Sequence, residues 1–333
     1  MSEPSSQDNP VFNLTTVHVV ARCIHVIADA GVADALDEEP RPAAELAAAT
    51  GLNADALGRI LRLLSTYGLF ARHGSGYVHT SGSRLLRTDH PVSMRSFARM
   101  IGTPMNWDHL TEFRHAAVTG RPKRDFAGAM AYFATHPEEA QIFNRAMIDV
   151  SGPMGPAIAG AYDFSRFGTI VDVGGGLGHL ARAIVDRYPT VEGVCFDVPH
   201  VVADAEVSGK ASTRLRFHGG DFFSDPLPIA DAYVIKQVIH DWDDEDAMRI
   251  LTSIHRAAPA TAKVLLVEQI APEPDDVSGP HPAILLDVMM LAATGGRERT
   301  ASEYAALLDA SGFRVEKVIR TPTLCSIVEA AVA

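Results

Sequence analysis

The chain has few cysteines, no excess of positive charge and no long uninterrupted apolar run. Its 333 residues include 3 cysteines, Cys23, Cys195 and Cys325, which lie far apart and form no Cys-x-x-Cys pair. Each lies in an apolar run, which favours buried thiols over disulfides or a thiolate metal site. Lys and Arg number 29 against 41 Asp and Glu, giving a formal net charge of -12. This balance argues against nucleic acid or an anionic membrane surface as the main partner.

Other absences concern the cellular compartment. The opening segment, Met1–Pro10, is polar and has no basic-then-apolar signal pattern, and no uninterrupted apolar run reaches the length of a membrane span. Hydrophobic residues make up 47% of the chain and charged residues 21%, as in ordinary globular proteins. The length predicts two domains, each large enough to bury a core. We therefore expect a cytoplasmic protein that does not depend on a membrane.

The first hundred residues predict a helical region with a winged-helix order. Val11–Leu36 carries apolar residues at close to a helical period. A short helix after Arg41 is stopped by Gly51, and Asn53 is a suitable N-cap for a second helix that ends at Gly68. Residues 69–79 then form a hairpin pattern around a glycine turn. Helix, turn, helix and a two-stranded wing is the winged-helix arrangement.

A winged helix admits two interpretations, DNA binding and protein–protein contact. Residues 1–100 contain nine Arg or Lys against ten Asp or Glu, and the second helix of the motif offers only Arg59 and Arg62 as cations. Without a basic excess, dimerisation is favoured over DNA binding. His18 and His25 could share a helix face, but they lack further ligands, so we expect no metal there.

The rest of the chain predicts an α/β architecture. Residues 104–162 are helical with several proline breaks, and β-like and helical runs alternate from residue 163 onward. The predicted strands are Thr169–Val173, Val191–Phe196, Leu215–Phe217, Ala232–Ile235, Lys263–Val267, Arg314–Ile319 and Ser326–Ala331. This alternation predicts a doubly wound, mostly parallel sheet, with the last two runs as an antiparallel hairpin at its edge. We predict a dimerisation domain over 1–103, a helical linker or substrate lid over 104–162, and a catalytic domain over 163–333.

A glycine turn marks the place where a cofactor is expected. The β-branched run Thr169–Val173 stops at three consecutive glycines, and a helical pattern begins at His179. A glycine turn at the carboxyl end of a buried strand lets a ligand approach the backbone. Residues 176–181 fit the G-x-G-x-x-A dinucleotide fingerprint, which is weak evidence alone. Asp197 ends the next strand, where a carboxylate serves the ribose of NAD and of S-adenosylmethionine equally well.

Two later segments help to distinguish between NAD and S-adenosylmethionine as the cofactor. Gly220-Asp221-Phe222-Phe223 follows the third predicted strand and offers a carboxylate and an aromatic ring to an adenine, although a turn with a buried aromatic would show the same pattern. Residues 236–245 follow the fourth strand and place His240 at the opening of the cofactor crevice. Asp241 could position His240, but adjacent strand residues point apart, which leaves a partner elsewhere open.

These motifs together resemble the S-adenosylmethionine-dependent O-methyltransferases related to plant caffeic acid and chalcone O-methyltransferases, in a bacterial, natural-product form. The segments that carry the resemblance are Val171–Gly178, Phe196–Pro199, Gly220–Phe223, Lys236–Glu245, Leu266–Glu268 and Gly295–Thr300. The resemblance spans nearly the whole chain. It implies a class I methyltransferase (Rossmann-like) domain, and it makes the winged-helix region the dimerisation domain of a homodimer.

The resemblance also implies roles for individual residues. The contacts to S-adenosylmethionine, or to its product S-adenosylhomocysteine, would be Gly174 and Gly176 at the turn, Asp197 at the ribose, Asp221 and Phe222 at the adenine, and Lys236 along the site. His240 would be the general base, with Asp241 beside it and Glu268 and Glu298 flanking it. The acceptor would contact Trp107, Phe143, Met147, Met289 and Met290.

The implied reaction is methyl transfer to a hydroxyl of an aromatic small molecule, such as a phenolic or polyketide natural product. No metal is required for this chemistry, and no cluster of carboxylates suggests the magnesium-dependent arrangement. Two alternatives stay open. One is a non-methylating enzyme, decarboxylase-like or hydroxylase-like, with the same fold and cofactor, and the other is a winged-helix regulator that senses a ligand. The complete set of His240, Asp241, Glu268 and Glu298 favours methyl transfer.

Overall fold

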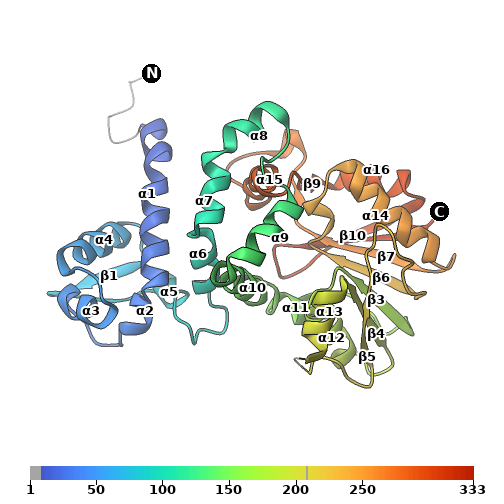
Figure 1. Cartoon of the computed structure of the whole chain (residues 1–333), viewed down its shortest axis with the longest axis horizontal. Coiled ribbons are helices and arrows are strands. Elements are labelled where there is room, and N and C mark those ends of the chain that lie inside the picture. The colour runs from blue at the N-terminus through green and yellow to red at the C-terminus, as the bar shows by residue number, and fades with distance from the viewer. Residues whose placement is uncertain (1–8, 208) are drawn as a thin grey trace. The chain divides into compact units, whose positions relative to one another are not determined.

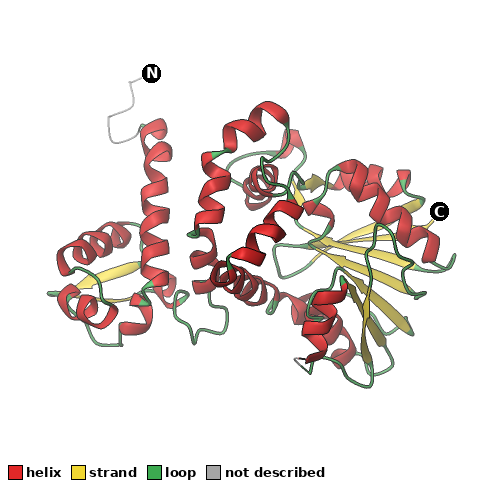
Figure 2. Ribbon diagram, in the orientation of Figure 1, coloured by secondary structure: helices red, strands yellow, loops and turns green. Residues whose placement is uncertain are grey.

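A computed structural model of the chain describes residues 9–207 and 209–333 (Figures 1 and 2). Most of the polar opening segment, residues 1–8, lies outside the described residues. The chain forms two compact units, one of residues up to 108 with 131–150, the other of 109–130 with 151–333. The domain boundaries predicted at residues 103 and 162 stay predictions.

The first unit is helical apart from one hairpin. Its elements are α1 (Pro10–Asp29), α2 (Val32–Ala35), α3 (Ala43–Thr50), α4 (Ala54–Thr66), β1 (Phe70–His73), β2 (Gly76–His79), α5 (Ser81–Arg84), α6 (Arg95–Ile101) and α10 (Pro137–Ser151). Helices α7 (Pro104–Thr111) and α9 (Phe126–Thr135) each cross from one unit to the other.

The predicted helix–turn–helix and hairpin are present. Gly51 ends α3 in the left-handed conformation, with φ of 72°. The side chain of Asn53 caps α4 by accepting from the amide N of Ala56 at 3.0 Å, and β1 pairs with β2 in antiparallel fashion. The core beneath these elements includes Ile27 and Leu57.

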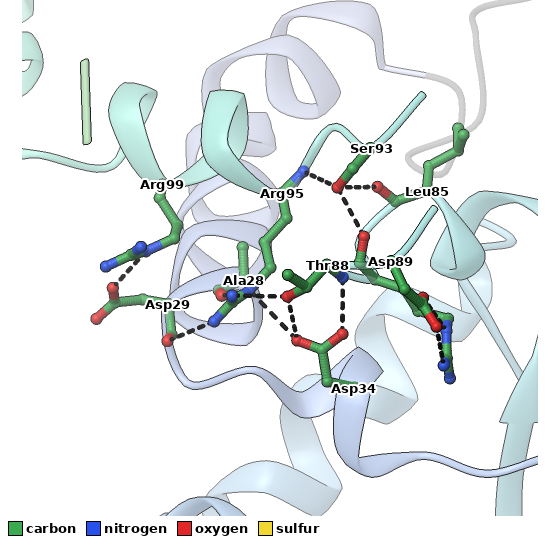
Figure 3. A network of polar contacts seen from close by, with 10 residues as sticks. Ala28, Asp29, Asp34, Leu85, Thr88, Asp89, Ser93, Arg95 and Arg99 are labelled. Atoms are coloured by element: carbon green, nitrogen blue, oxygen red, sulfur yellow. Dashed lines mark hydrogen bonds and ion pairs between the residues drawn. The ribbon is translucent and has the colours of Figure 1, made fainter. Parts of the chain in front are cut away.

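A polar network joins the end of α1 to the segment before α6 (Figure 3). The guanidinium of Arg95 donates to the carbonyl of Ala28 at 2.8 Å and to the hydroxyl of Thr88 at 2.9 Å. The carboxylate of Asp34 accepts from both the amide and the hydroxyl of Thr88, each at 2.7 Å. The amide of Gly31 also donates to the carbonyl of Ala28, at 3.4 Å, so Arg95 adds a second donor to a carbonyl in the last turn of α1.

Helix α1 exposes apolar side chains along its first half, whereas Val20, Ile27 and Ala28 in its second half are buried. The exposed fractions lie between 47% and 73% for Val11, Phe12, Leu14, Val17 and Val19. With 20 residues and a mean hydropathy of 1.5, α1 is long and apolar enough to cross a membrane by length and composition alone. The sequence prediction considered only uninterrupted apolar runs, and polar residues such as Asn13 and Arg22 interrupt this one. An exposed apolar surface of this kind marks an interaction site.

The second unit is an α/β domain. Its strands are β3 (Thr169–Val173), β4 (Glu192–Asp197), β5 (Leu215–Gly219), β6 (Ala232–Lys236), β7 (Lys263–Glu268), β8 (Ile270–Ala271), β9 (Arg299–Thr300), β10 (Phe313–Arg320) and β11 (Ser326–Val332). Its helices are α8 (Phe113–Thr119), α11 (Met154–Ala161), α12 (His179–Arg187), α13 (Pro199–Val207), α14 (Asp244–Ala257), α15 (Pro282–Ala293) and α16 (Ala301–Ala310). All seven predicted strands are confirmed to within two residues at each end.

The main sheet has the strand order β10-β11-β7-β6-β3-β4-β5. Strand β3 is parallel to both β4 and β6, and β11 is antiparallel to both β7 and β10, as predicted. Apolar residues of α11 and α12 pack on one face of the sheet, and those of α14 and α16 pack on the other. The chain leaves β3 toward β4 and later returns to its other side as β6. This switch point is where an open α/β sheet binds ligands.

Candidate active site

The turn after β3 begins with three consecutive glycines, so its backbone there lies at the switch point without side chains. Gly174 and Gly176 have positive φ values of 67° and 57°, which L side chains rarely adopt. A Cβ on Gly175 would lie 2.7 Å from the sulfur of Cys195, so only glycine fits there. A Cβ on Gly176 would meet nothing within 4 Å. The backbone at Gly176 therefore borders open space that a ligand can enter.

Asp197 lies at the end of β4 and is held against this turn. One carboxylate oxygen accepts from the amide of Gly176 and the other from the amide of Val198, both at 2.8 Å. Burial raises the pKa of Asp197, and the two amide donors oppose that rise. Each oxygen keeps a lone pair for a further donor. The predicted ribose carboxylate thus lies beside the predicted glycine turn, an arrangement that fits the ribose and methionine parts of S-adenosylmethionine.

The sequence did not point to two polar residues near this turn, Asp172 and Ser151. Asp172 is a buried carboxylate within β3, and it accepts from the amide of Ala181 at 3.1 Å. Burial raises its pKa to about 6, while the charge of Lys236 and the Ala181 amide act in the opposite direction. Lys236, predicted to follow the fourth strand, is the last residue of β6, and its Nζ donates to the hydroxyl of Ser151 at 3.3 Å. A lone charge in an apolar strand was the signal for Asp172; Ser151 gave none.

The predicted adenine motif follows β5. One carboxylate oxygen of Asp221 accepts from the amide of Phe223 at 2.9 Å and thereby stabilises the turn. The ring of Phe222 lies edge-on to that of Trp242, with centroids 6.1 Å apart, and Phe223 contacts the same indole at 4.8 Å. The structure therefore brings the adenine motif against the segment that carries His240.

His240 is paired with Glu298. It lies in a 3₁₀ turn, Ile239–Asp241, that follows β6, and it is 8% exposed. Its Nδ1 is 2.6 Å from Oε1 of Glu298, whereas its Nε2 is 3.8 Å from the nearer oxygen of Asp241. Because a carboxylate can only accept, Nδ1 carries the hydrogen and the neutral ring keeps its basic lone pair on Nε2. The partner that the sequence left open is thus Glu298.

Glu268 contacts the backbone of the same turn. Its Oε1 accepts from the amides of Val238 and Ile239 at 3.1 and 2.9 Å. Among the described residues, the second oxygens of Glu268 and Glu298 are buried without a hydrogen-bond partner. A buried polar atom left unpaired calls for an explanation, and a catalytic role is one such explanation.

The charge of His240 depends on these carboxylates. Burial by itself would lower the pKa of the imidazole, but the carboxylates of Asp241, Glu268 and Glu298 outweigh it and raise the pKa to about 10. Burial also raises the pKa of Glu268, to about 7, against the opposing charge of His240. The imidazolium is therefore the favoured form at neutral pH when no other charge is bound.

The predicted acceptor contacts fall in both units. Met289 and Met290 lie half-buried on α15. Trp107 on α7, and Phe143 and Met147 on α10, are half-buried in the first unit. Within the described ranges, no group of three or more His, Cys, Asp or Glu could hold a metal ion.

A parallel sheet with this glycine turn, a carboxylate at the end of β4 and a histidine–carboxylate pair after β6 defines a class I methyltransferase. The family of the O-methyltransferase domain matches residues 107–314, and that of the O-methyltransferase dimerisation domain matches residues 12–89. The chain belongs to the O-methyltransferase family, and its cofactor is S-adenosylmethionine.

Individual relatives agree with this assignment. A phenazine O-methyltransferase of Lysobacter antibioticus is 36% identical over 330 residues, which cover 96% of this chain and 95% of that protein. The structure of CalO1, a methyltransferase of calicheamicin biosynthesis with S-adenosylhomocysteine bound, is similar with a TM-score of 0.86, 34% identity and 97% coverage of both chains. NcsB1, an O-methyltransferase of neocarzinostatin biosynthesis in complex with S-adenosylmethionine and a hydroxynaphthoic acid, has a TM-score of 0.77, 31% identity and coverage of 94% of this chain and 96% of its own.

Proposed function

We propose that the protein transfers the methyl group of S-adenosylmethionine to a hydroxyl of an aromatic small molecule, with His240 as the general base. The observation that carries this proposal is the buried pair of His240 and Glu298, 2.6 Å apart, at the carboxyl end of β6. A phenol with a pKa of about 10 is a poor nucleophile at neutral pH, whereas its phenolate is a good one. A base that takes the hydroxyl proton during attack removes this barrier.

The residues of the proposed site have separate roles in the reaction. Nε2 of His240 takes the hydroxyl proton as the new oxygen–carbon bond forms, and Glu298 stabilises the imidazolium through Nδ1. Bound S-adenosylmethionine supplies the methyl group on a sulfonium and leaves as a neutral thioether. Gly174, Gly176 and Asp197 hold the cofactor, with Asp221 and Phe222 at its adenine and Lys236 along the site. Their task is to align the reacting atoms.

The acceptor is proposed to be aromatic. The named relatives act on or bind fused-ring compounds, a phenazine in one case and a naphthoic acid in another. Met289 and Met290 on α15 are proposed contacts, since thioethers pack favourably against rings. Trp107, Phe143 and Met147 remain proposed contacts on the same ground of residue type.

Product analysis tests this function. The protein is incubated with S-adenosylmethionine labelled in its methyl group and a panel of phenols, naphthols and hydroxylated polyketides, and the products are examined by mass spectrometry. Transfer of the labelled methyl group to oxygen supports the proposal. Loss of carboxyl or gain of hydroxyl oxygen without label would instead support the non-methylating alternative.

Removal of the Glu298 charge should shift the pH dependence of the reaction. The carboxylate favours the imidazolium, so Glu298→Gln should lower the pKa of His240 and move the acidic limb of kcat/KM to lower pH by about 1–3 units. The amide keeps the shape and an acceptor, so kcat should fall less than on loss of His240. Glu316→Gln, which removes a surface carboxylate paired with Lys263, is the control. An unmoved limb in Glu298→Gln would show that Glu298 does not set the basicity of His240.

The enzyme is also proposed to work as a soluble cytoplasmic homodimer, without nucleic acid or membrane. The dimerisation-domain match covers most of α1, so a second copy is the proposed cover for its exposed apolar residues. Light scattering should give twice the chain mass of 35.7 kDa, and the interface should exceed a standard area of roughly 1,600 Å². Leu14→Asp with Val17→Asp should produce monomers, whereas Arg59→Asp, at an exposed residue of α4, should not. A wild-type monomer at micromolar concentration would contradict the dimer.

A further inference from the structure

The backbone that carries His240 has an unfavourable conformation. Among the described residues, Gln237 is the one non-glycine residue with a positive φ, 50°, and it lies two residues before the 3₁₀ turn that carries the histidine. Such conformations persist only where the surrounding structure fixes them. Glu268 fixes the amide side of the turn through Val238 and Ile239. The carbonyl groups of the turn need partners of their own.

Arg299 supplies these partners. Its side chain is 1% exposed, which is rare for an arginine. The guanidinium donates to the carbonyls of Ile239 at 3.2 Å and Trp242 at 3.0 Å, one on each side of His240. It also donates twice to one carboxylate oxygen of Asp244, at 2.9 and 2.7 Å, at the start of α14. A fourth acceptor is the carbonyl of Arg297, at 3.4 Å. A planar group with five donors can reach four acceptors at once, which a lysine ammonium does less well.

The segment before Arg299 lies against the same turn. The amide of Arg297 donates to the carbonyl of His240 at 2.9 Å. A Cβ on Gly296 would lie 2.0 Å from that carbonyl oxygen, so the two backbones are in direct contact. Glu298 lies between these two arginines in the sequence, and its own amide donates to the carboxylate of Asp287 on α15 at 2.9 Å. One short segment therefore provides both the partner of His240 and the support for its backbone.

We propose that Arg299 is a positioning residue for the reaction, which holds the turn Ile239–Trp242 so that His240 stays paired with Glu298. The inference rests on the proposed role of His240 as base. The hydrogen bonds of Arg299 go to Asp244 and to backbone carbonyls around His240, and none of them joins Arg299 to a proposed cofactor contact. The loss of Arg299 should therefore reduce the rate of the chemical step and leave cofactor affinity in place.

Arg299→Lys keeps the charge and removes the planar fork. We expect kcat to fall by about 10-fold or more, as when a reacting group is misplaced by a fraction of an ångström, with an unchanged dissociation constant for S-adenosylhomocysteine. The proton on Nδ1 of His240, in a short bond to a carboxylate, should give a far-downfield resonance in the wild type. That resonance should broaden or disappear in Arg299→Lys. Arg314→Lys, a matched exchange at an exposed residue of β10, should change none of these readouts.

Asp244→Ala is the second variant, in case Arg299→Lys does not fold. It leaves Arg299 in place but removes two of its hydrogen bonds, so kcat should fall by a smaller factor. The dissociation constant for S-adenosylhomocysteine should again stay unchanged. Wild-type kcat and an intact downfield resonance in either folded variant would overturn the inference. Full activity in His240→Ala would instead show that the proposed base is wrong, which separates the two failures.

Discussion

Replacement of His240 by alanine should lower kcat by about 10²–10⁴-fold, the usual cost of losing a general base. The affinity for S-adenosylhomocysteine should stay unchanged. The proposed cofactor contacts, Gly176 in the turn after β3 and Asp197 at the end of β4, share no hydrogen bond with the imidazole. The deficit should shrink as the pH rises toward the pKa of the acceptor, since the acceptor then ionises without help. Stopped-flow or quenched single-turnover rates, with calorimetry of the product complex, measure both quantities.

The structure predicts how the rate of the wild-type enzyme depends on pH. The carboxylates around His240 raise its pKa to about 10 despite burial, so a neutral base is scarce at pH 7 unless another positive charge is bound nearby. The wild-type rate should therefore rise with pH through the neutral range. Near-normal turnover by His240→Ala at neutral pH would show that the base is another group or that the acceptor is already ionised.

Replacement of Asp197 by alanine should weaken binding of S-adenosylmethionine by about 1–3 kcal/mol, or roughly 5- to 150-fold. The ribose hydroxyls would lose their proposed acceptor, and the amides of Gly176 and Val198 lose theirs as well. Asp197→Asn keeps one acceptor oxygen and should cost less. Calorimetry with the cofactor measures the loss, and NAD serves as the negative control.

A loss of affinity in Asp197→Ala must be assigned either to the cofactor contact or to a change in the fold. Because the side chain of Asp197 also fixes the glycine turn, thermal unfolding of each variant must be compared with that of the wild type. A folded Asp197→Ala protein that binds S-adenosylmethionine as tightly as the wild type would remove Asp197 from the cofactor site. Tight NAD binding by the wild type would contradict the cofactor assignment for the whole unit.

The sheet could be predicted from the sequence because its strands are short apolar runs bounded by glycine, proline or helical patterns. The glycine turn was predictable for the same reason, since three consecutive glycines after a β-branched run have few structural uses. The helical stretch before the sheet was less informative. Residues 109–130 belong to the second unit and 131–150 to the first, and no change of composition marks this division.

The sequence predicted which residues form the site better than it predicted the contacts between them. The sequence placed His240 at the end of a strand but left its partner open, because Glu298 is 58 residues away and Asp241 is adjacent. The resemblance put Glu268 beside the histidine, and the structure adds that Glu268 accepts from two backbone amides of the same turn. Arg299 lies in a segment that carries the resemblance, Gly295–Thr300, but no role was predicted for it from the sequence. Only the fold shows that this guanidinium is buried against the turn.

The most direct test of the account compares acceptors that differ in acidity. Phenols of matched size, with pKa values from about 7 to about 10, are methylated by the wild type and by His240→Ala at one neutral pH under single-turnover conditions. If His240 takes the proton, the ratio of the two rates should be largest for the weakest acid and approach one for the acceptor that is already ionised. A constant ratio across the series would show that His240 affects folding or alignment only, and would contradict the proposal that it is the base.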